Sequence, residues 1–491
     1  MNLADQCLNI LGIYVPTLCF FKGEKQEVDH ETITKHVQRL ARAGVQGLVA
    51  NGTTGEPSHL SRAERVAVIK THRAALDSAG FHKLPLIVGT GVSSTWETIE
   101  LTKEAADAGL YWSIYSKYTL YAVDHGFLRS RLFFSFGSHG PESCRFKCAD
   151  AMSLLIGTTT SNEPFSTTQQ HDPHRPSSRC NPKRGIYVPT LCFFKGEKQE
   201  VDHETIAKHV QRLARAGVQG LVANGTTGEL PFACEPSHLS RTERLAVIKT
   251  HRAALDSAGF HKLPLIVGTG VSSTWETIEL TKEAAEAGGS FAMIIPPGYF
   301  KSAMTDASIE AFYTEVADAS PIPILLYNFP GVGASNGIDL ELSLIAKLAK
   351  HPNIVGIKLS CGNLGKAARL AALYSQDEFA IFMGLAEMLL HGLTGSGISG
   401  AITGLANDAP KACIRVYESY AKGDLEGARK AQQEVSTAGE IELKGGIHAM
   451  RYGCVHYFGY GGESRRPFQP ISEELKAKTV AWLDPVMDRE K

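Results

Sequence analysis

The stretch that decides the fold is Asn353-Ile354-Val355-Gly356-Ile357-Lys358-Leu359-Ser360. Its β-branched residues predict a short buried strand over 354–358. Strict alternation puts Lys358 on the same face as Ile354 and Gly356, and Val355 falls on the opposite face. A lysine at the end of such a strand is either a snorkelling surface residue or a desolvated amine that can form a Schiff base. This stretch alone favours the surface interpretation.

Composition places the chain among globular proteins, and its charge and apolar runs give no sign of binding to nucleic acid or to a membrane. Of its 491 residues 43% are hydrophobic and 21% are charged, and the net charge is −1. No apolar run reaches the ~18 residues that span a bilayer. The ten cysteines lack a disulfide spacing, and Cys144 and Cys148 alone are a weak metal signal. Residues 1–12 contain no Lys or Arg, which favours a cytoplasmic over a mitochondrial location.

A long internal repeat dominates the organisation of the chain. Gly12–Gly109 recurs as Gly185–Gly288 with four substitutions and six extra residues, 230–235, in the second copy. We expect 12–109 to be a partial duplicate of only three βα units, which cannot close a barrel alone. The segment 110–184 starts with aromatic residues and ends in a polar tract, so we expect an irregular, disordered spacer.

From residue 185 onward, strand-like and helical patterns alternate. Such alternation predicts a parallel sheet, and eight units in about 220 residues favour a closed (β/α)₈ barrel. The predicted strands are 186–190, 220–224, 265–268, 292–296, 324–328, 354–358, 380–383 and 398–402. Further helical patterns follow to about residue 485. The predicted complete unit is therefore 185–485, a barrel with a C-terminal helical extension.

In such a barrel the catalytic groups lie at the C-terminal ends of the strands. The second strand leads into Gly225, Thr226 and Thr227, whose backbone and hydroxyl groups suit a carboxylate, although a plain glycine turn explains them equally well. Tyr327 ends the fifth strand and should point inward beside the sixth, where a phenol can relay protons; a structural tyrosine is the commoner case. Tyr299 follows the fourth strand and could line the mouth or reach a partner subunit.

Three motifs in order carry a family resemblance. They are Gly-Thr-Thr-Gly-Glu at 225–229, Tyr-Asn-Phe-Pro at 327–330 and Gly-Ile-Lys-Leu-Ser at 356–360. Together they resemble the dihydrodipicolinate synthase / N-acetylneuraminate lyase family, over 185–485 and again over 12–109. The resemblance implies a (β/α)₈ barrel, usually a tetramer, and class I lyase chemistry on 2-oxo acids without a metal or other cofactor.

The resemblance also implies residue roles. Lys358 would form the imine with pyruvate or its adduct, and Tyr327 would act as proton relay. Thr226 would complete the relay, and Thr227 would hold the carboxylate of the 2-oxo acid. Two further positions, Gly384 and Ile402, match residues that line the pyruvate pocket. With these partners Lys358 is predicted to be a nucleophile, and Gly356 to leave room beside its stem.

One difference between this sequence and the family's synthases concerns the choice of substrate. Dihydrodipicolinate synthases carry an arginine where this chain has Val332, which argues against aspartate semialdehyde. The motif resembles fungal members that split L-threo-3-deoxy-hexulosonate into pyruvate and L-glyceraldehyde, and 4-hydroxy-2-oxoglutarate aldolases are close alternatives. A synthase-like condensation and a catalytically impaired barrel with a binding role also stay open.

The extra residues 230–235 fall at the expected pocket mouth and could displace Thr226 and Thr227. The first copy has an uninterrupted motif with Thr53 and Thr54, so it could dock with 289–485 in place of the second copy. Docking of the first copy would close a loop of about 180 residues between residue 109 and residue 289. Closing this loop costs roughly 3 kcal/mol more in chain entropy than closing a short connection. The local second copy is therefore expected in the barrel unless its insertion costs more.

Overall fold

The structure is a computed structural model. It describes residues 13–23, 26–92, 95–107, 112–116, 119–124, 127–133, 181–225 and 238–490. The polar tract expected to be a disordered linker lies outside these residues.

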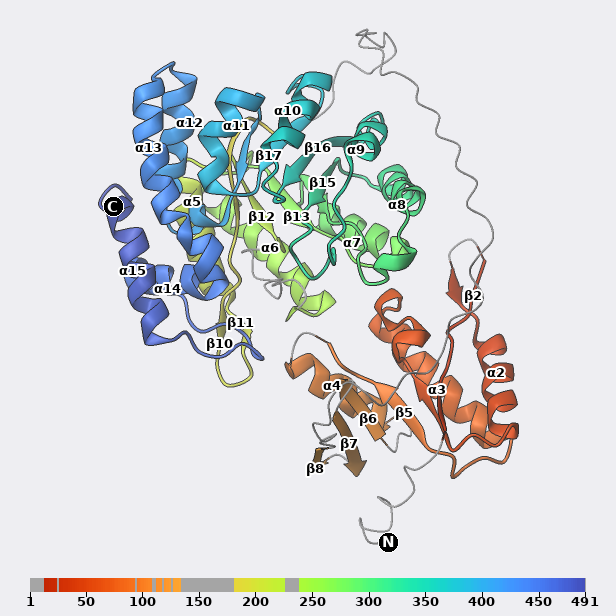
Figure 1. Cartoon of the computed structure of the whole chain (residues 1–491). Helices are drawn as coiled ribbons and strands as arrows, with labels where there is room; N and C mark the ends of the chain where they lie inside the picture. The colour runs from red at the N-terminus through yellow and green to blue at the C-terminus, as the bar shows by residue number, and fades with distance from the viewer. Residues whose placement is uncertain are drawn as a thin grey trace, which may run out of the picture.

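Eight parallel strands close into a barrel (Figure 1). The first strand pairs with the last, with Gly185 opposite Gly400. The predicted (β/α)₈ fold is confirmed, and the second copy supplies its first three strands. The strands are β9 (Gly185–Pro189), β12 (Gly220–Ala223), β13 (Leu265–Gly268), β14 (Phe291–Ile294), β15 (Ile324–Asn328), β16 (Ile354–Leu359), β17 (Ala380–Met383) and β18 (Gly400–Ile402).

Helices follow the strands and cover the outside of the barrel. Their starts follow local capping: at α6, for example, Ser240 and Glu243 form a reciprocal capping box. A small hairpin, β10 (Phe194–Lys195) and β11 (Glu200–Val201), which the sequence did not predict, precedes the first helix. The helices are α5 (His203–Arg215), α6 (Arg241–Ser257), α7 (Thr274–Glu286), α8 (Asp306–Ala319), α9 (Leu342–Leu348), α10 (Leu364–Leu373), α11 (Leu389–Ser396) and α12 (Pro410–Ala421).

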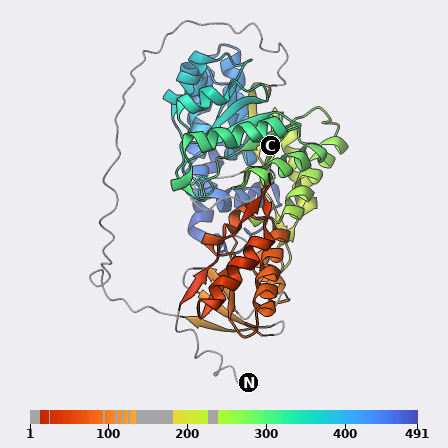
Figure 2. The same ribbon diagram turned by 90° about the vertical axis from the view of Figure 1, so that its right-hand side faces the viewer.

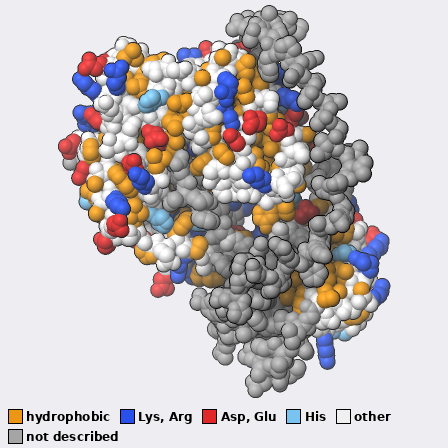
Figure 3. All heavy atoms as spheres, viewed as in Figure 1, with side chains coloured by type: hydrophobic (Ala, Val, Ile, Leu, Met, Phe, Trp, Pro, Cys, Tyr) orange, Lys and Arg blue, Asp and Glu red, His pale blue; other side chains and the backbone are white. Residues whose placement is uncertain are grey.

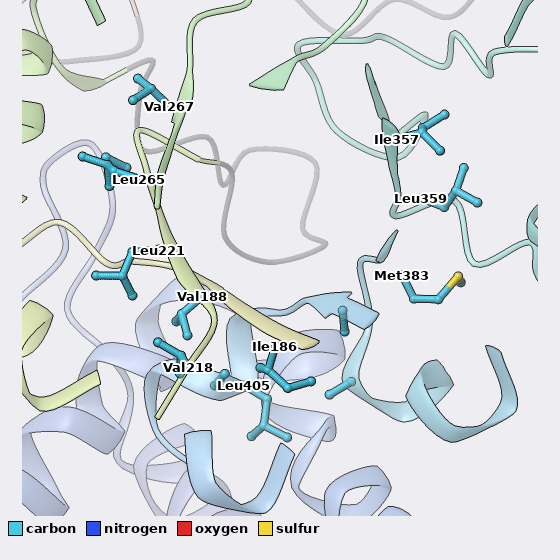
Figure 4. Packing of buried hydrophobic residues seen from close by; sticks show 14 of the residues in the cluster. Ile186, Val188, Val218, Leu221, Leu265, Val267, Ile357, Leu359, Met383 and Leu405 are labelled. Carbon is cyan, nitrogen blue, oxygen red and sulfur yellow. The ribbon is translucent and has the colours of Figure 1, made fainter. Parts of the chain in front are cut away.

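The core has two layers. Outward-facing strand residues such as Leu221, Leu265 and Leu359 pack under the helices (Figure 4). Inward-facing residues, among them Val222, Ile266 and Tyr327, fill the barrel itself. Burial of both strand faces explains why these strands are nearly continuous apolar runs.

The predicted C-terminal helices are present. The last helix of the barrel, α12, packs against α13 (Leu425–Ala438), and α14 (Gly446–Phe458) packs against α15 (Glu473–Met487). Figure 1 shows these helices gathered on one side of the barrel. A π-helical turn, η8 (Ile441–Gly445), joins α13 to α14 and was not predicted. A π-helical turn frequently marks a functional position.

The first copy forms an open sheet and not a barrel, in the order β1-β4-β5-β6-β7-β8. Tyr14 is half-buried on its edge strand, whereas its counterpart Tyr187, between two strands of the barrel, is fully buried. The last three strands lie in 112–133, where the sequence shows no persistent period. The elements are β1 (Tyr14–Pro16), β2 (Phe21–Lys22), β3 (Glu27–Val28), α2 (His30–Arg42), β4 (Gly47–Ala50), α3 (Arg62–Ser78), β5 (Leu86–Gly89), α4 (Thr95–Asp107), β6 (Trp112–Ser116), β7 (Thr119–Asp124) and β8 (Phe127–Phe133).

The surface of the barrel carries charges of both signs. Basic and acidic side chains are interspersed over the face seen in Figure 3. Within the described ranges, no helix has the length and apolar character needed to cross a bilayer.

Candidate active site

Lys358 lies near the C-terminal end of β16 and is 2% exposed. The parallel register of β15 and β16 sets it directly opposite Tyr327, which is equally buried. Its Nζ lies 3.2 Å from the Tyr327 hydroxyl oxygen and 4.3 Å from the centre of the phenol ring. The structure thus brings an amine and a phenol together inside the barrel, as the sequence predicted.

A β-bulge aims Lys358 inward. Ile324 pairs with Ile354 and Leu325 pairs with Gly356, which leaves Val355 as the extra residue of β16. Val355 consequently belongs to the barrel interior, and Ile354 packs in the outer layer. The alternation predicted for these two residues is therefore wrong. Bulges often re-aim side chains beside active sites.

Two glycines let neighbouring strands approach the lysine closely. A Cβ on Gly356 would lie 2.4 Å from the carbonyl oxygen of Ala380, so this glycine makes room for β17. A Cβ on Gly384 would lie 1.9 Å from the Ser360 hydroxyl. The Gly384 amide donates to the carbonyl oxygen of Leu359 at 2.8 Å, which fixes it beside Lys358.

A polar network that the sequence analysis missed braces the end of β15. The Asn328 amide donates to Asp339 at 2.6 Å, and the Leu340 amide donates back to Asn328 at 2.9 Å. The buried ammonium of Lys366 donates to the same Asp339 carboxylate at 2.5 Å. Its members lie up to 38 residues apart in the sequence, and no spacing signals their meeting.

The segment after β15 places an apolar side chain, Val332, in the barrel interior. Val332 is 1% exposed and packs in the interior cluster with Tyr327 and Phe329. Ile402, at the end of β18, belongs to the same cluster. The wall around Tyr327 is therefore apolar at these two positions.

The barrel opens into a cleft that both copies line. Gly225, Tyr299 and Tyr327 line it from the barrel, and Tyr299 is 47% exposed. His59 of the first copy packs edge-on against Phe300 with ring centroids 5.3 Å apart. In both views the first copy lies at one end of the barrel (Figures 1 and 2).

Charged groups also line this cleft. Burial raises the pKa of the Glu276 carboxyl, although the guanidinium of Arg241 at 2.9 Å opposes that shift. Burial likewise lowers the pKa of Arg65, on the first copy. The described residues contain no group of three His, Cys, Asp or Glu side chains that could hold a metal ion.

Two of the four predicted threonines, Thr226 and Thr227, lie outside the described residues, as do the extra residues 230–235. Thr53 and Thr54 are exposed in a 3₁₀ turn of the first copy and are not among the residues that line the cleft.

A buried lysine held against a phenol near the C-terminal ends of barrel strands is placed where active sites of such barrels lie, and a desolvated amine can form a Schiff base. Comparison with known proteins specifies the class. The model of the dihydrodipicolinate synthetase family matches residues 9–114 and 183–485. The chain belongs to this family, whose members are class I, pyruvate-dependent aldolases, and it is a lyase of that type.

Relatives in fungi share most of their length with this chain. A protein of Emericella nidulans named as a mitochondrial 4-hydroxy-2-oxoglutarate aldolase is 44% identical over 303 residues, 62% of this chain and 94% of that protein. An L-threo-3-deoxy-hexylosonate aldolase of Hypocrea jecorina is 40% identical over 314 residues, 62% of this chain and 97% of that enzyme.

Solved structures show the same fold. A dihydrodipicolinate synthase family protein from Coccidioides immitis is 30% identical with a TM-score of 0.56, over 64% of this chain and 98% of its own. A family member from Escherichia coli K12, solved in complex with pyruvate, is 26% identical with a TM-score of 0.55, over 62% and 98%.

Proposed function

We propose that this aldolase cleaves a 2-oxo-3-deoxy sugar acid of the L-threo-3-deoxy-hexulosonate type, with Lys358 as the Schiff-base nucleophile. The observation that carries the proposal is the 3.2 Å contact between the Lys358 amine and the Tyr327 hydroxyl inside the closed barrel. Both groups are buried, and exclusion of water strengthens electrostatic interactions at the reacting atoms.

The chemistry follows from these two groups. The Lys358 amine attacks the C2 ketone of the substrate, and water leaves to give a protonated imine. Tyr327 gives its phenolic proton to the departing hydroxide, and the resulting phenolate then takes the proton of the C4 hydroxyl. The C3–C4 bond breaks, and its electron pair moves into the imine to give an enamine. Protonation of C3 and hydrolysis then release pyruvate, and the departing fragment is an aldehyde.

The predicted carboxylate contacts complete the proposal. By the family resemblance, Thr226 extends the proton relay and Thr227 holds the carboxylate of the 2-oxo acid. Gly225, which leads into them, lines the cleft together with Tyr299. Gly384 and Ile402 form the wall beside the imine, which their positions next to Lys358 and Tyr327 support.

The buried Val332 supports an uncharged departing aldehyde such as L-glyceraldehyde, because the wall offers no cation there. A second candidate substrate is 4-hydroxy-2-oxoglutarate, which the 44% identity to the Emericella nidulans protein favours. Pyruvate release from each compound, followed with a coupled reductase, ranks the two by kcat/KM. A higher kcat/KM for 4-hydroxy-2-oxoglutarate would make this compound the preferred substrate in place of L-threo-3-deoxy-hexulosonate.

Borohydride reduction in the presence of pyruvate tests the nucleophile. The adduct should map to the peptide of Lys358 and not to that of Lys366, the other buried lysine of the barrel, which is engaged with Asp339. An unlabelled Lys358 in the wild type would favour an impaired barrel with a binding role, and full activity in Lys358→Ala would refute Lys358 as the nucleophile.

We also propose that the predicted unit 185–485 is the catalytic unit, because all eight barrel strands lie within it. Deletion of 1–184 should leave a folded, pyruvate-binding protein, and loss of the barrel would favour assembly with the first copy. Light scattering tests the tetramer that the resemblance implies. Cell fractionation tests the cytoplasmic location, because one relative is named mitochondrial.

A further inference from the structure

A buried carboxylate of the C-terminal region reaches the ends of two barrel strands. Glu442, in the π-helical turn η8, is 4% exposed. Its Oε1 accepts from the Thr403 hydroxyl at 2.7 Å and from the Leu405 amide at 2.9 Å. Its Oε2 accepts from the Ala386 amide at 3.2 Å. One carboxylate thus joins the segments that follow β17 and β18.

Burying the Glu442 carboxylate costs free energy unless both of its oxygens accept hydrogen bonds. Burial raises the pKa of Glu442, and the hydrogen bonds from Thr403 and from the backbone oppose that shift. A Cβ on Gly404 would lie 3.0 Å from Oε1, so the chain passes the carboxylate without room for a larger residue. A buried ionisable group that is satisfied in this way rigidifies the segments it joins.

Both segments carry the wall of the proposed site. Ala386 comes two residues after Gly384, whose amide is bonded to Leu359, the neighbour of Lys358. Thr403 directly follows Ile402, which packs with Tyr327 in the barrel interior. A shift of either segment would therefore move the wall against which the 2-oxo acid must lie.

A second side chain of the helical extension holds the same region. Gln432, on α13, donates to the carbonyl oxygen of Ala386 at 3.1 Å and accepts from the amide of Leu390 at 2.8 Å. Ala386 is thus held through its amide by one residue and through its carbonyl by another. Among the described residues, Glu442 is the side chain shown to bridge the segments after β17 and β18 in this way.

We infer that Glu442 is a positioning residue that sets the distance between Gly384 and Ile402 and so fixes the pocket for the 2-oxo acid substrate. The inference rests on the proposed Schiff-base function. It gives the C-terminal helical region a role in substrate binding, exerted through the barrel and without contact to the reacting atoms.

Glu442→Gln tests the inference. The glutamine side chain keeps the size of the glutamate but offers only one acceptor oxygen. The backbone amide of either Ala386 or Leu405 would then face the NH₂ group of the glutamine, which cannot accept its hydrogen bond. Half-saturation by pyruvate in borohydride trapping should rise about tenfold, which corresponds to ~1.4 kcal/mol of binding. The KM for cleavage should rise with it, and kcat should fall less than KM rises.

Glu490→Gln is a matched control. Glu490 is also a buried carboxylate that accepts from backbone amides, those of Lys411 and Ala412 at 3.1 and 2.8 Å, but it holds the start of α12. This variant should lower thermal stability and leave the half-saturation by pyruvate unchanged. An equal half-saturation in Glu442→Gln and wild type would overturn the inference.

Thr403→Val keeps the inference testable if Glu442→Gln fails to fold. It removes one donor to Glu442 without changing side-chain size, and it should raise the half-saturation in the same direction by about threefold. An unchanged value would also overturn the inference. Failure of wild type to trap pyruvate would instead refute the proposed function, so the two failures are distinguishable.

Discussion

Lys358 and Tyr327 face each other across β16 and β15, with the amine 3.2 Å from the phenol oxygen. The contact is a consequence of register, since neighbouring parallel strands end at the same edge of the barrel. A bulge at Val355 shifts the preceding ladder by one residue. The approach of the two reactive groups therefore depends on the backbone geometry of β15 and β16.

Tyr327→Phe should lower kcat by about 10²- to 10⁴-fold, the usual contribution of a positioned proton donor or acceptor. Trapping of pyruvate should persist, because the Lys358 amine is retained. Tyr187→Phe is the control: Tyr187 is also buried in the barrel interior, but its hydroxyl donates to the carbonyl of Lys183. Equal losses in the two variants would contradict the proton-relay role.

Gly356→Ala and Gly384→Ala should each destabilise the barrel by about 1–3 kcal/mol or more, as overpacked sites do. The added Cβ would lie 2.4 Å from the carbonyl oxygen of Ala380 or 1.9 Å from the Ser360 hydroxyl. Gly395→Ala, on α11 with no atom within 4 Å, should stabilise by about 0.5–1 kcal/mol. Chemical unfolding curves compare the three variants, and a neutral Gly384→Ala would disprove the close approach of β17.

Acidification should destabilise the fold through His251. Burial lowers its folded-state pKa to about 4, against about 6.5 for an unfolded histidine. Between those values the unfolded chain binds a proton that the folded chain does not, so stability falls as pH falls through this window. The expected loss from this residue is about 2 kcal/mol at pH 5 relative to pH 7.

Unfolding of His251→Gln at pH 7 and pH 5 measures that contribution. The variant should lose part of the pH dependence, although it also loses the contact with Thr190 at 2.7 Å. His261→Gln, which removes an exposed histidine, is the matched substitution for comparison. Identical pH dependence in His251→Gln and wild type would contradict the prediction.

The sequence predicted the barrel because its strands are buried on both faces and its helices carry caps and apolar stripes. It also predicted the meeting of Lys358 and Tyr327, since strand ends are ordered in a closed barrel. It could not predict the bulge at Val355, because a period-two pattern assumes an unbroken ladder. Glu442 was missed for another reason: its partners, Ala386 and Thr403, lie 56 and 39 residues away, and only the tertiary fold brings them together.

Removing residues 230–235 is the sharpest test of the duplication. It restores in the second copy the uninterrupted motif that the first copy has at 52–57. If the insertion displaces Thr226 and Thr227, its removal should raise kcat/KM by about 10- to 100-fold, because a ~1 Å misplacement costs ~10²-fold. Inserting the same six residues after Glu56 is the matched control, and it should leave kcat/KM unchanged because Thr53 and Thr54 do not line the cleft. If the insertion after Glu56 lowers activity and the removal of 230–235 has no effect, Thr53 and Thr54 of the first copy would instead be the threonines that act with Lys358.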